Sequence, residues 1–485
     1  MPPILAATPL LIVIALLASG RVGALVAGAA GLAATVAAIV LSPPAGAALG
    51  GFLAHHGAVG AWLAWQVVAI VVGGVFFHRC VQSRARIADA AGATPTPADT
   101  HRQLYFIAFL LGPFAESVTG FGVGTIVALA AIARLGLGGL PALTFALYSQ
   151  SFVPWGALAV GTTVGGLLAG ITPTDLGLRC ALLQAPIHLG YLLLFWRYCA
   201  QAGSPLDWRR RLDDLAWTAS AVAGVWAAHA IVDVEIAGAA PLGALVALRW
   251  WRDARPDGAR IASAALGAAP YIALTLALLA TRIVAPLQAA LKTLAAWRPL
   301  DGQPAFAPFY APGFWLVAVG VATLVAARAA PAPVLRATAA AAWRPSVVTL
   351  LFVVMAAYYV AGGMAAAIAD ALHRAAGDSA AFGAPFFAAL GGFLTGSGAA
   401  SNAMLMPMQT ALAGEARLDR AWMAAVQNGV TANLTMLSPI RVSMGVALLA
   451  LAGGESAAYR RVWPLALPPL LAGLAAVGLL LATRG

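Results

Sequence analysis

Two apolar segments of this chain hold the residues whose types could do chemistry. The first contains "FAESVTGFGVGT", which places Glu116 and Thr119 among closely spaced glycines, and the second contains "LSPIRVSMGVA", which places Arg441 two positions after Pro439. A carboxyl group can take up and release a proton, and a guanidinium group can hold a carboxylate through two parallel hydrogen bonds. The pattern therefore predicts that Glu116 carries a proton and that Arg441 binds a carboxylate.

Both residues also allow a structural interpretation. Ionisable groups in hydrocarbon usually line a pathway or pair with an opposite charge. Glu116 could instead cap N–H groups at a turn, and Arg441 could pair with Glu116 or with backbone carbonyls. Neutral donors accompany both residues, and any one of them could simply satisfy helix packing. The predicted substrate-binding residues are Thr119, Ser397, Asn402, Asn433, Ser438 and Arg441.

The composition identifies the surroundings of these residues as a membrane. The chain has 485 residues, of which 62% are hydrophobic and 9% are charged, against about 45–50% and about 25% in soluble proteins. The net charge of +11 comes from arginines in short loops between apolar runs, which fits topology signalling and not nucleic-acid binding. The three cysteines, Cys80, Cys180 and Cys199, predict neither a disulfide framework nor a metal site.

Apolar runs of the length needed to cross a bilayer recur along the chain. They lie near residues 4–19, 22–42, 59–78, 179–196, 214–232, 236–250, 261–281, 312–327, 346–369 and 463–481. Two further regions are apolar but interrupted, and we interpret each as a re-entrant hairpin followed by a broken span. The hairpins are expected at 103–134 and 381–412, and the broken spans at 141–171 and 420–450.

This arrangement places most of the 28 lysine and arginine residues on the cytoplasmic side, as the positive-inside rule requires. It predicts an all-α polytopic membrane protein with about twelve spans, two hairpins and both termini outside. The hairpins open to opposite sides, which is the inverted-repeat plan of secondary transporters. The predicted parts are N-terminal helices at 1–102, a first repeat at 103–250, connecting helices at 251–345 and a second repeat at 346–485.

The hairpin residues resemble those of the lactate permease family, which consists of proton symporters for L-lactate and glycolate. "FAESVTGFGVGTIVALAAIARLG" is similar to the first hairpin of that family, "GGFLTGSGAASNAMLMPMQTA" to its second, and "GVTANLTMLSPIRVSMGVA" to its later Ser-Pro element. The resemblance implies an inverted-repeat fold of the ion-transporter superfamily type. The residues that match the family motifs are Glu116, Thr395, Gly396, Ser397, Ser401, Asn402, Ser438 and Pro439.

Three departures from the family pattern concern charge. Gly398 stands where the family has an aspartate, "NLTM" lacks the lysine that precedes the Ser-Pro element, and Arg441 stands where the family has a neutral residue. These changes alter the charges of the presumed site. The chain therefore resembles a divergent member of the family, and the departures bear on the substrate more than on the fold.

We therefore expect a secondary transporter of the inner membrane that takes up small monocarboxylates, such as lactate or glycolate, with protons. Its expected partners are the carboxylate, protons and the lipid bilayer, without nucleic acid, cofactor or metal; a homo-oligomer is compatible with the sequence. The chain is not expected to be an enzyme. The alternatives are a carrier for another organic or inorganic anion, driven by protons or sodium, and a passive anion channel.

Other polar residues receive simpler interpretations. Asp233 and Glu235 are expected to be exposed loop charges on the outer side. His188 and His229 fall within predicted spans, where a buried histidine bonded to a neighbouring helix is expected more often than a proton relay.

Overall fold

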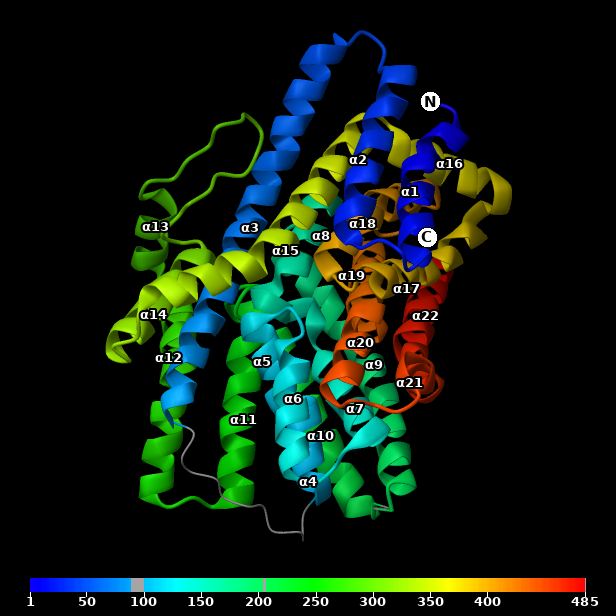
Figure 1. Ribbon diagram of the computed structural model, residues 1–485. Helices are drawn as coiled ribbons and strands as arrows, with labels where there is room; N and C mark the ends of the chain where they lie inside the picture. Colours follow the sequence, from blue (N-terminus) through cyan, green and yellow to red (C-terminus); the bar gives the residue numbers. More distant parts are fainter. Residues whose placement is uncertain (89–99, 204–205, 485) are drawn as a thin grey trace.

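The protein is a bundle of helices that lie mostly along one common direction (Figure 1). The computed structural model describes residues 1–88, 100–203 and 206–484, apart from the side chains of residues 84–88. Within these residues there is no β-strand, and only Trp297 and Phe306 form an isolated bridge. A helix satisfies its own backbone hydrogen bonds, so it suits an apolar chain that has no water to bond to. The predicted all-α membrane class is confirmed.

The helices of the first half run from the N-terminus to the end of α11. They are α1 (Pro3–Ala18), α2 (Ala24–Leu41), α3 (Leu49–Ala88), α4 (Thr100–Tyr105), the π-helix η2 (Phe106–Leu111), α5 (Gly112–Thr119), α6 (Val123–Arg134), α7 (Gly139–Leu147), the 3-10 turns η3 (Tyr148–Gln150) and η4 (Val153–Trp155), α8 (Gly156–Ala169), α9 (Pro173–Gln201), α10 (Trp208–Ile231) and α11 (Ala239–Ala254).

The second half of the chain runs from α12 to α22, and its first two helices connect it to the first half. Its helices are α12 (Gly258–Ile283), α13 (Ala285–Thr293), α14 (Pro312–Ala326), α15 (Pro331–Ala361), α16 (Met364–Ala376), η5 (Gly377–Gly383), α17 (Ala384–Thr395), α18 (Gly398–Glu415), α19 (Arg420–Leu434), η6 (Thr435–Leu437), α20 (Pro439–Leu448), α21 (Gly454–Val462), η7 (Trp463–Ala466) and α22 (Leu467–Thr483).

Six helical stretches in the described residues are long and apolar enough to cross a membrane, and a seventh arises if the bent pair Gly139–Gln150 and Val153–Ala169 counts as one span. Other expected spans form helices of only 15–16 residues, namely α1, α11 and α14. The count of twelve therefore stays a prediction. The expected span at 346–369 is wrong in its bounds, because α15 ends at Ala361 and Gly363 takes a positive φ before α16 begins.

Helical pairs with tight tips occupy both regions where hairpins are predicted. The first pair is α5 and α6, joined by Gly120, Phe121 and Gly122, which all have positive φ. The second pair is α17 and α18, joined at Gly396 and Ser397, where Gly396 has a φ of +62°. Glycine takes such angles without a steric penalty, so it permits the tight turn.

Both regions for which broken spans are predicted contain an interruption between two helices. The first consists of α7 and α8, whose axes meet at a bend of 55° across Gln150 to Val153. The second consists of α19 and α20, separated by η6 and Ser438, whose extended backbone precedes Pro439. In Figure 1 the first passes from α7 in the lower half of the view to α8 above it, whereas the second passes from α19 above to α20 below. The chain therefore passes through the two broken helices in opposite directions.

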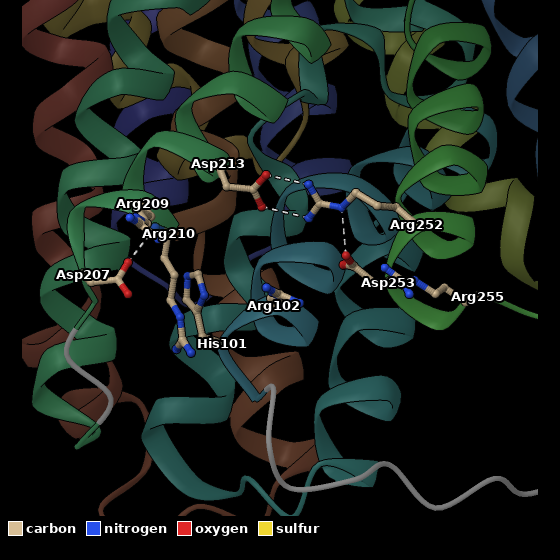
Figure 2. Close-up of a pocket in the computed structure, with 9 residues that line it drawn as sticks. All are labelled: His101, Arg102, Asp207, Arg209, Arg210, Asp213, Arg252, Asp253 and Arg255. Atoms are coloured by element: carbon tan, nitrogen blue, oxygen red, sulfur yellow. Dashed lines mark hydrogen bonds and ion pairs between the residues drawn. The ribbon is translucent and has the colours of Figure 1, made fainter.

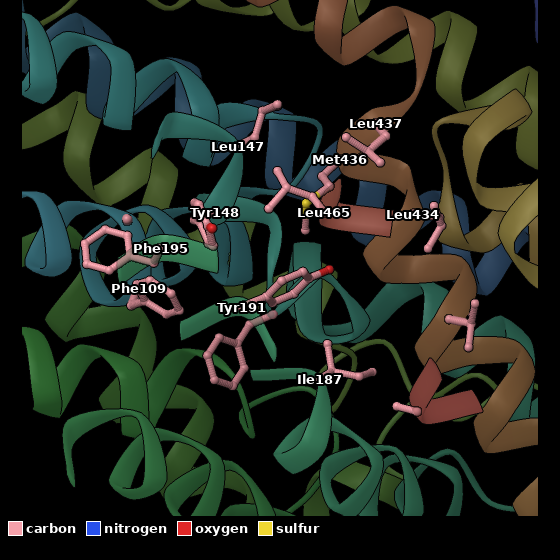
Figure 3. Packing of buried hydrophobic residues seen from close by; sticks show 14 of the residues in the cluster. Phe109, Leu147, Tyr148, Ile187, Tyr191, Phe195, Leu434, Met436, Leu437 and Leu465 are labelled. Carbon is pink, nitrogen blue, oxygen red and sulfur yellow. The ribbon is translucent and has the colours of Figure 1, made fainter. Parts of the chain in front are cut away.

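Aromatic side chains hold the first break against α9. The ring of Tyr148, in η3, lies 5.9 Å from that of Tyr191 and 5.8 Å from that of Phe195, centroid to centroid. Figure 3 shows these rings in one buried cluster with Phe109 of η2 and with Leu437, which belongs to the break in the second half. The two breaks thus share one apolar core, which keeps them in a defined position near the middle of the bundle.

Candidate functional site

Glu116 lies inside the first hairpin and caps the start of its second helix. Its side chain is buried, with 1% of the residue surface exposed. Oε1 accepts a hydrogen bond from the backbone N–H of Gly122 at 3.1 Å, and Oε2 accepts one from Gly124 at 2.9 Å. A Cβ atom on Gly124 would lie 2.6 Å from the carbonyl oxygen of Gly112, so glycine is required for this close approach. The carboxyl group thus satisfies N–H donors that a helix start leaves unpaired.

Arg441 reaches the same carboxyl group from the other half of the chain. Its Nη1 atom lies 3.3 Å from Oε1 of Glu116, and Arg441 itself is 7% exposed. The arginine stands in the first turn of α20, directly after the second break. The side chain donates no other hydrogen bond within the described residues. Glu116 therefore caps backbone N–H groups and also pairs with Arg441, which are the structural interpretations given above. Most N–H donors of the Arg441 guanidinium group make no hydrogen bond within the described residues.

The two hairpin tips share a local pattern. The hydroxyl groups of Thr119 and Thr395 each donate to the carbonyl oxygen four residues earlier, at 2.6 Å and 2.7 Å. A glycine with positive φ follows each threonine, at Gly120 and Gly396. Because its hydroxyl hydrogen is engaged within its own helix, Thr119 supports the hairpin and donates no hydrogen bond toward the Glu116–Arg441 pair.

Each tip packs against the break of its own half. A Cβ atom on Gly120 would lie 2.5 Å from Cβ of Ala157, and one on Gly396 would lie 2.8 Å from Oγ of Ser438. Ala157 begins a run of three residues with φ between 51° and 62° at the start of α8. Left-handed angles cost L-residues about 1–2 kcal/mol each, and such strain concentrates at functional sites.

Asn402 connects the second hairpin to the first broken helix. Its Nδ2 group donates to the carbonyl oxygen of Gly161 at 2.9 Å and to Oδ1 of Asn428 at 2.8 Å, and its Oδ1 accepts from Gln427 at 3.3 Å. Asn428 continues the network to the hydroxyl of Thr162 at 2.9 Å. All these groups are buried, so the network fixes how α18, α19 and α8 sit together.

Two of the predicted residues hold buried polar atoms without a partner among the described residues. The Oγ atom of Ser438 makes no hydrogen bond, and neither does Oδ1 of Asn433, whose Nδ2 donates to Gln184 at 3.0 Å. Ser397 is half-buried at the second tip, where its Oγ accepts from the backbone N–H of Ala400 at 3.3 Å. Buried polar groups are rarely left unpaired, so these atoms suit contact with water or a ligand.

The structure therefore brings Glu116 and Arg441 into direct contact, places Ser438 three residues before Arg441 against the second tip, and assigns Asn402 to a separate network. Sequence reasoning missed Gln427 and Asn428. Their signal was present, because two adjacent amides in the otherwise apolar stretch "AAVQNGVTANL" need partners at membrane depth.

The expectation that Asp233 and Glu235 are exposed loop charges is wrong. Both are half-buried in the turn between α10 and α11, and Oε2 of Glu235 is buried without a hydrogen bond. Asp233 accepts hydrogen bonds from Thr174 at 2.8 Å and Tyr310 at 3.2 Å. Burial, and then the neighbouring Asp233 carboxylate, raise the pKa of Glu235 to about 7. The turn folds back between helices that the sequence does not reveal to be neighbours.

The two histidines that fall within predicted spans differ in their partners. Nε2 of His229 accepts a hydrogen bond from the indole N–H of Trp155, which belongs to η4 at the first break. Nδ1 of His188 contacts the carbonyl oxygen of Gln184 at 2.9 Å, within its own helix. The expected bond to a neighbouring element is present for His229, whereas His188 is bonded within its own helix.

Comparison with known proteins finds sequence similarity to permeases. Residues 266–480 match the family model described as L-lactate permease. Glycolate permease GlcA of Escherichia coli (strain K12) is 28% identical over 162 residues, which cover 33% of this chain and 28% of that protein. L-lactate permease of Salmonella typhimurium (strain LT2) is 24% identical, and the alignment covers 82% of this chain and 81% of the relative. The second half of the chain is thus similar to the L-lactate permease family, and most of its length aligns with one permease at low identity.

Proposed function

We propose that this protein is a secondary active transporter that takes up small monocarboxylates, such as lactate or glycolate, together with protons across the inner membrane. The observation that carries the proposal is the buried contact between Glu116 and Arg441, which joins the first hairpin to the second broken helix. The printed names of the relatives, a glycolate permease and an L-lactate permease, support the substrate class and a transporter instead of an enzyme.

The inverted-repeat architecture is part of the proposal. The opposite courses of the two broken helices in Figure 1, and the matched threonine–glycine tips, support two related units inserted in opposite senses. In such carriers the discontinuous helices meet near the midplane, and substrate anions bind there. Twelve spans and alternating access around the Glu116–Arg441 pair follow from this plan.

Proton coupling follows from the charge balance of the pair. A buried guanidinium group needs one anion, and Glu116 supplies it when the site is empty. A substrate carboxylate that binds Arg441 would leave two carboxylates beside one cation, which is costly at low dielectric. If Glu116 takes up a proton at this step, the site stays neutral. One proton and one carboxylate therefore enter together, and Glu116 returns to Arg441 when both have left.

The remaining predicted residues have distinct proposed roles around this exchange. Ser438 and Asn433 each present an unpaired buried oxygen atom near the second break, and they would bind the hydroxyl group of a 2-hydroxy acid. Ser397 would bind substrate from the second tip. Thr119 and Asn402 would position the hairpins, since their side chains are engaged within the protein.

The test is uptake of a labelled carboxylate panel by proteoliposomes, with and without an imposed pH gradient. We expect lactate or glycolate to accumulate above its external concentration when the outside is acidic, without added sodium. If accumulation requires sodium, then sodium and not the proton is the coupling ion. Flux that equilibrates substrate but never concentrates it would identify a passive channel and refute coupling.

A further inference from the structure

A basic pocket lies at the end of the bundle where α4 begins, α10 begins and α11 ends. It has a volume of about 570 Å³ and is lined by five arginines, three aspartates and one histidine (Figure 2). It is remote from the hairpin tips, since in Figure 1 these helix ends stand at the lower edge of the view. None of the residues assigned to carboxylate binding or proton transfer lines it.

The aspartates of the pocket are already engaged. Arg252 donates to both oxygens of Asp213, at 2.6 Å and 2.9 Å, and to Asp253 at 2.9 Å. Beneath them the fully buried Arg249 lies 3.0 Å from Asp213 and 2.6 Å from Asp253. Asp207 caps α10 by accepting from the backbone N–H of Arg210 at 2.8 Å. These contacts fix the floor of the pocket and engage the carboxylates of Asp213 and Asp253, whereas Asp207 accepts only a backbone N–H.

Three arginines on the wall keep their charge uncompensated. The guanidinium groups of Arg209, Arg210 and Arg255 have no ion pair within the described residues, and Arg209 lies over the ring of Trp208 at 5.5 Å. Figure 2 shows Arg209 and Arg210 on one side of the pocket and Arg255 on the opposite side. Guanidinium groups bind phosphate oxygens in the same two-pronged way as carboxylates.

The pocket also rests on a buried polar framework. His101 lines it and is 4% exposed; its Nε2 atom contacts Asp214 at 3.0 Å, while Nδ1 has no partner among the described residues. The rings of Tyr105 and Trp217 each hold the guanidinium carbon of Arg249 at 5.2 Å. An occupant would therefore rest on a preformed floor, and Arg209 and Arg255 would reach it from exposed positions.

The flanks of the pocket match the level of lipid head groups. Trp208 and Trp251 stand beside the pocket arginines and are 66% and 61% exposed, and tryptophan is enriched at membrane–water interfaces. The positive-inside rule assigns these arginine-rich ends to the cytoplasm, where basic pockets between helices bind anionic head groups.

We propose that this pocket is a phosphate-binding site, formed by Arg209, Arg210 and Arg255, for the phosphate of an anionic phospholipid head group or of a free phosphorylated solute. The bound phosphate group connects the start of α10 and the end of α11 to the start of α4. Residues Thr100 to Thr119 form one continuous helical segment through α4, η2 and α5. The site therefore adjoins the segment that contains Glu116.

Binding is tested on the purified full chain in a neutral detergent, by native mass spectrometry and thermal unfolding. One arm adds phosphatidylglycerol or cardiolipin, with diacylglycerol as the phosphate-free lipid. The other arm adds pyrophosphate, and its control is the same neutral, sulfonate-free buffer without pyrophosphate. Saturable binding in the lipid arm alone identifies a lipid head group, and binding of pyrophosphate identifies a soluble ligand; both outcomes support the site.

The decisive variants are Arg210→Gln combined with Arg255→Gln, and Arg209→Gln alone. The matched control is Arg344→Gln, because Arg344 is also exposed and lies 5.4 Å over the adjacent Trp343 ring. We expect the double variant to weaken binding at least about tenfold, the single variant to weaken it less, and the control to bind as the unchanged protein does. Equal binding by all variants, equal binding of diacylglycerol, or no binding in either arm would overturn the proposal.

Discussion

Removing the charges of Glu116 and Arg441 separately should cost more stability in sum than removing both together. At 3.3 Å and an effective dielectric constant of about 20, the Coulomb attraction is about 5 kcal/mol. Removal of one member of a buried pair costs about 3–5 kcal/mol, because the other charge is left uncompensated. Glu116→Gln leaves Arg441 without its anion, whereas Arg441→Met leaves Glu116 with two backbone donors, so we expect the first change to cost more.

The double variant leaves no unpaired charge at this pair, so its loss should be well below the sum of the two single losses. We expect a coupling energy of about 2–4 kcal/mol from the double-mutant cycle. The assay is the free energy of unfolding in mixed micelles, without substrate, for the four proteins of the cycle. Glu415→Gln, at an exposed glutamate of α18, controls for loss of a carboxylate. Single losses that add within about 0.5 kcal/mol would refute a direct interaction of the pair.

The other predictions concern the substrate anchor, the topology and the buried turn. Arg441→Lys should raise the half-saturation concentration for carboxylates but less than Arg441→Gln, because an ammonium group keeps the charge and loses the fork; equal values for all three proteins would assign Arg441 to structure alone. In a background without the native cysteines, a cysteine at Gly203 should label only from the cytoplasm and one at Leu300 only from outside, and the reverse pattern would contradict the proposed insertion. Ionisation of Glu235 should lower the stability of the protein as pH rises from about 4.5 to about 7, since its pKa is raised in the folded protein. Glu235→Gln should match the unchanged protein below this range and exceed its unfolding free energy above it by about 3 kcal/mol; a constant difference across pH would contradict this.

The helix interruptions in the two apolar regions could be predicted because their signals are local. Gly120 and Gly396 permit angles that other residues avoid, and Pro439 cannot continue a helix. The direct contact of Glu116 with Arg441 was only one of several alternatives. The two residues are 325 positions apart, and composition says nothing about which helices become neighbours.

Partners of other buried groups were beyond sequence reasoning for the same reason. Glu235 follows an apolar run and looks like a loop charge, yet the chain folds the turn inward against Tyr310 and Thr174 through Asp233. The buried Arg249 gives no sign in the sequence that two aromatic rings will enclose it. Such contacts depend on tertiary packing, which overrides local pattern.

The account depends most on the exchange of a substrate carboxylate for Glu116 at Arg441. Glu116→Gln keeps the shape of the side chain and removes its proton binding, so it separates coupling from transport. The measurement is pH-driven uphill uptake and substrate counterflow on the same reconstituted variant, each normalised to folded protein. We expect uphill accumulation to be lost while counterflow persists, because exchange does not require release of the proton. Normal pH-driven accumulation by Glu116→Gln would contradict the account.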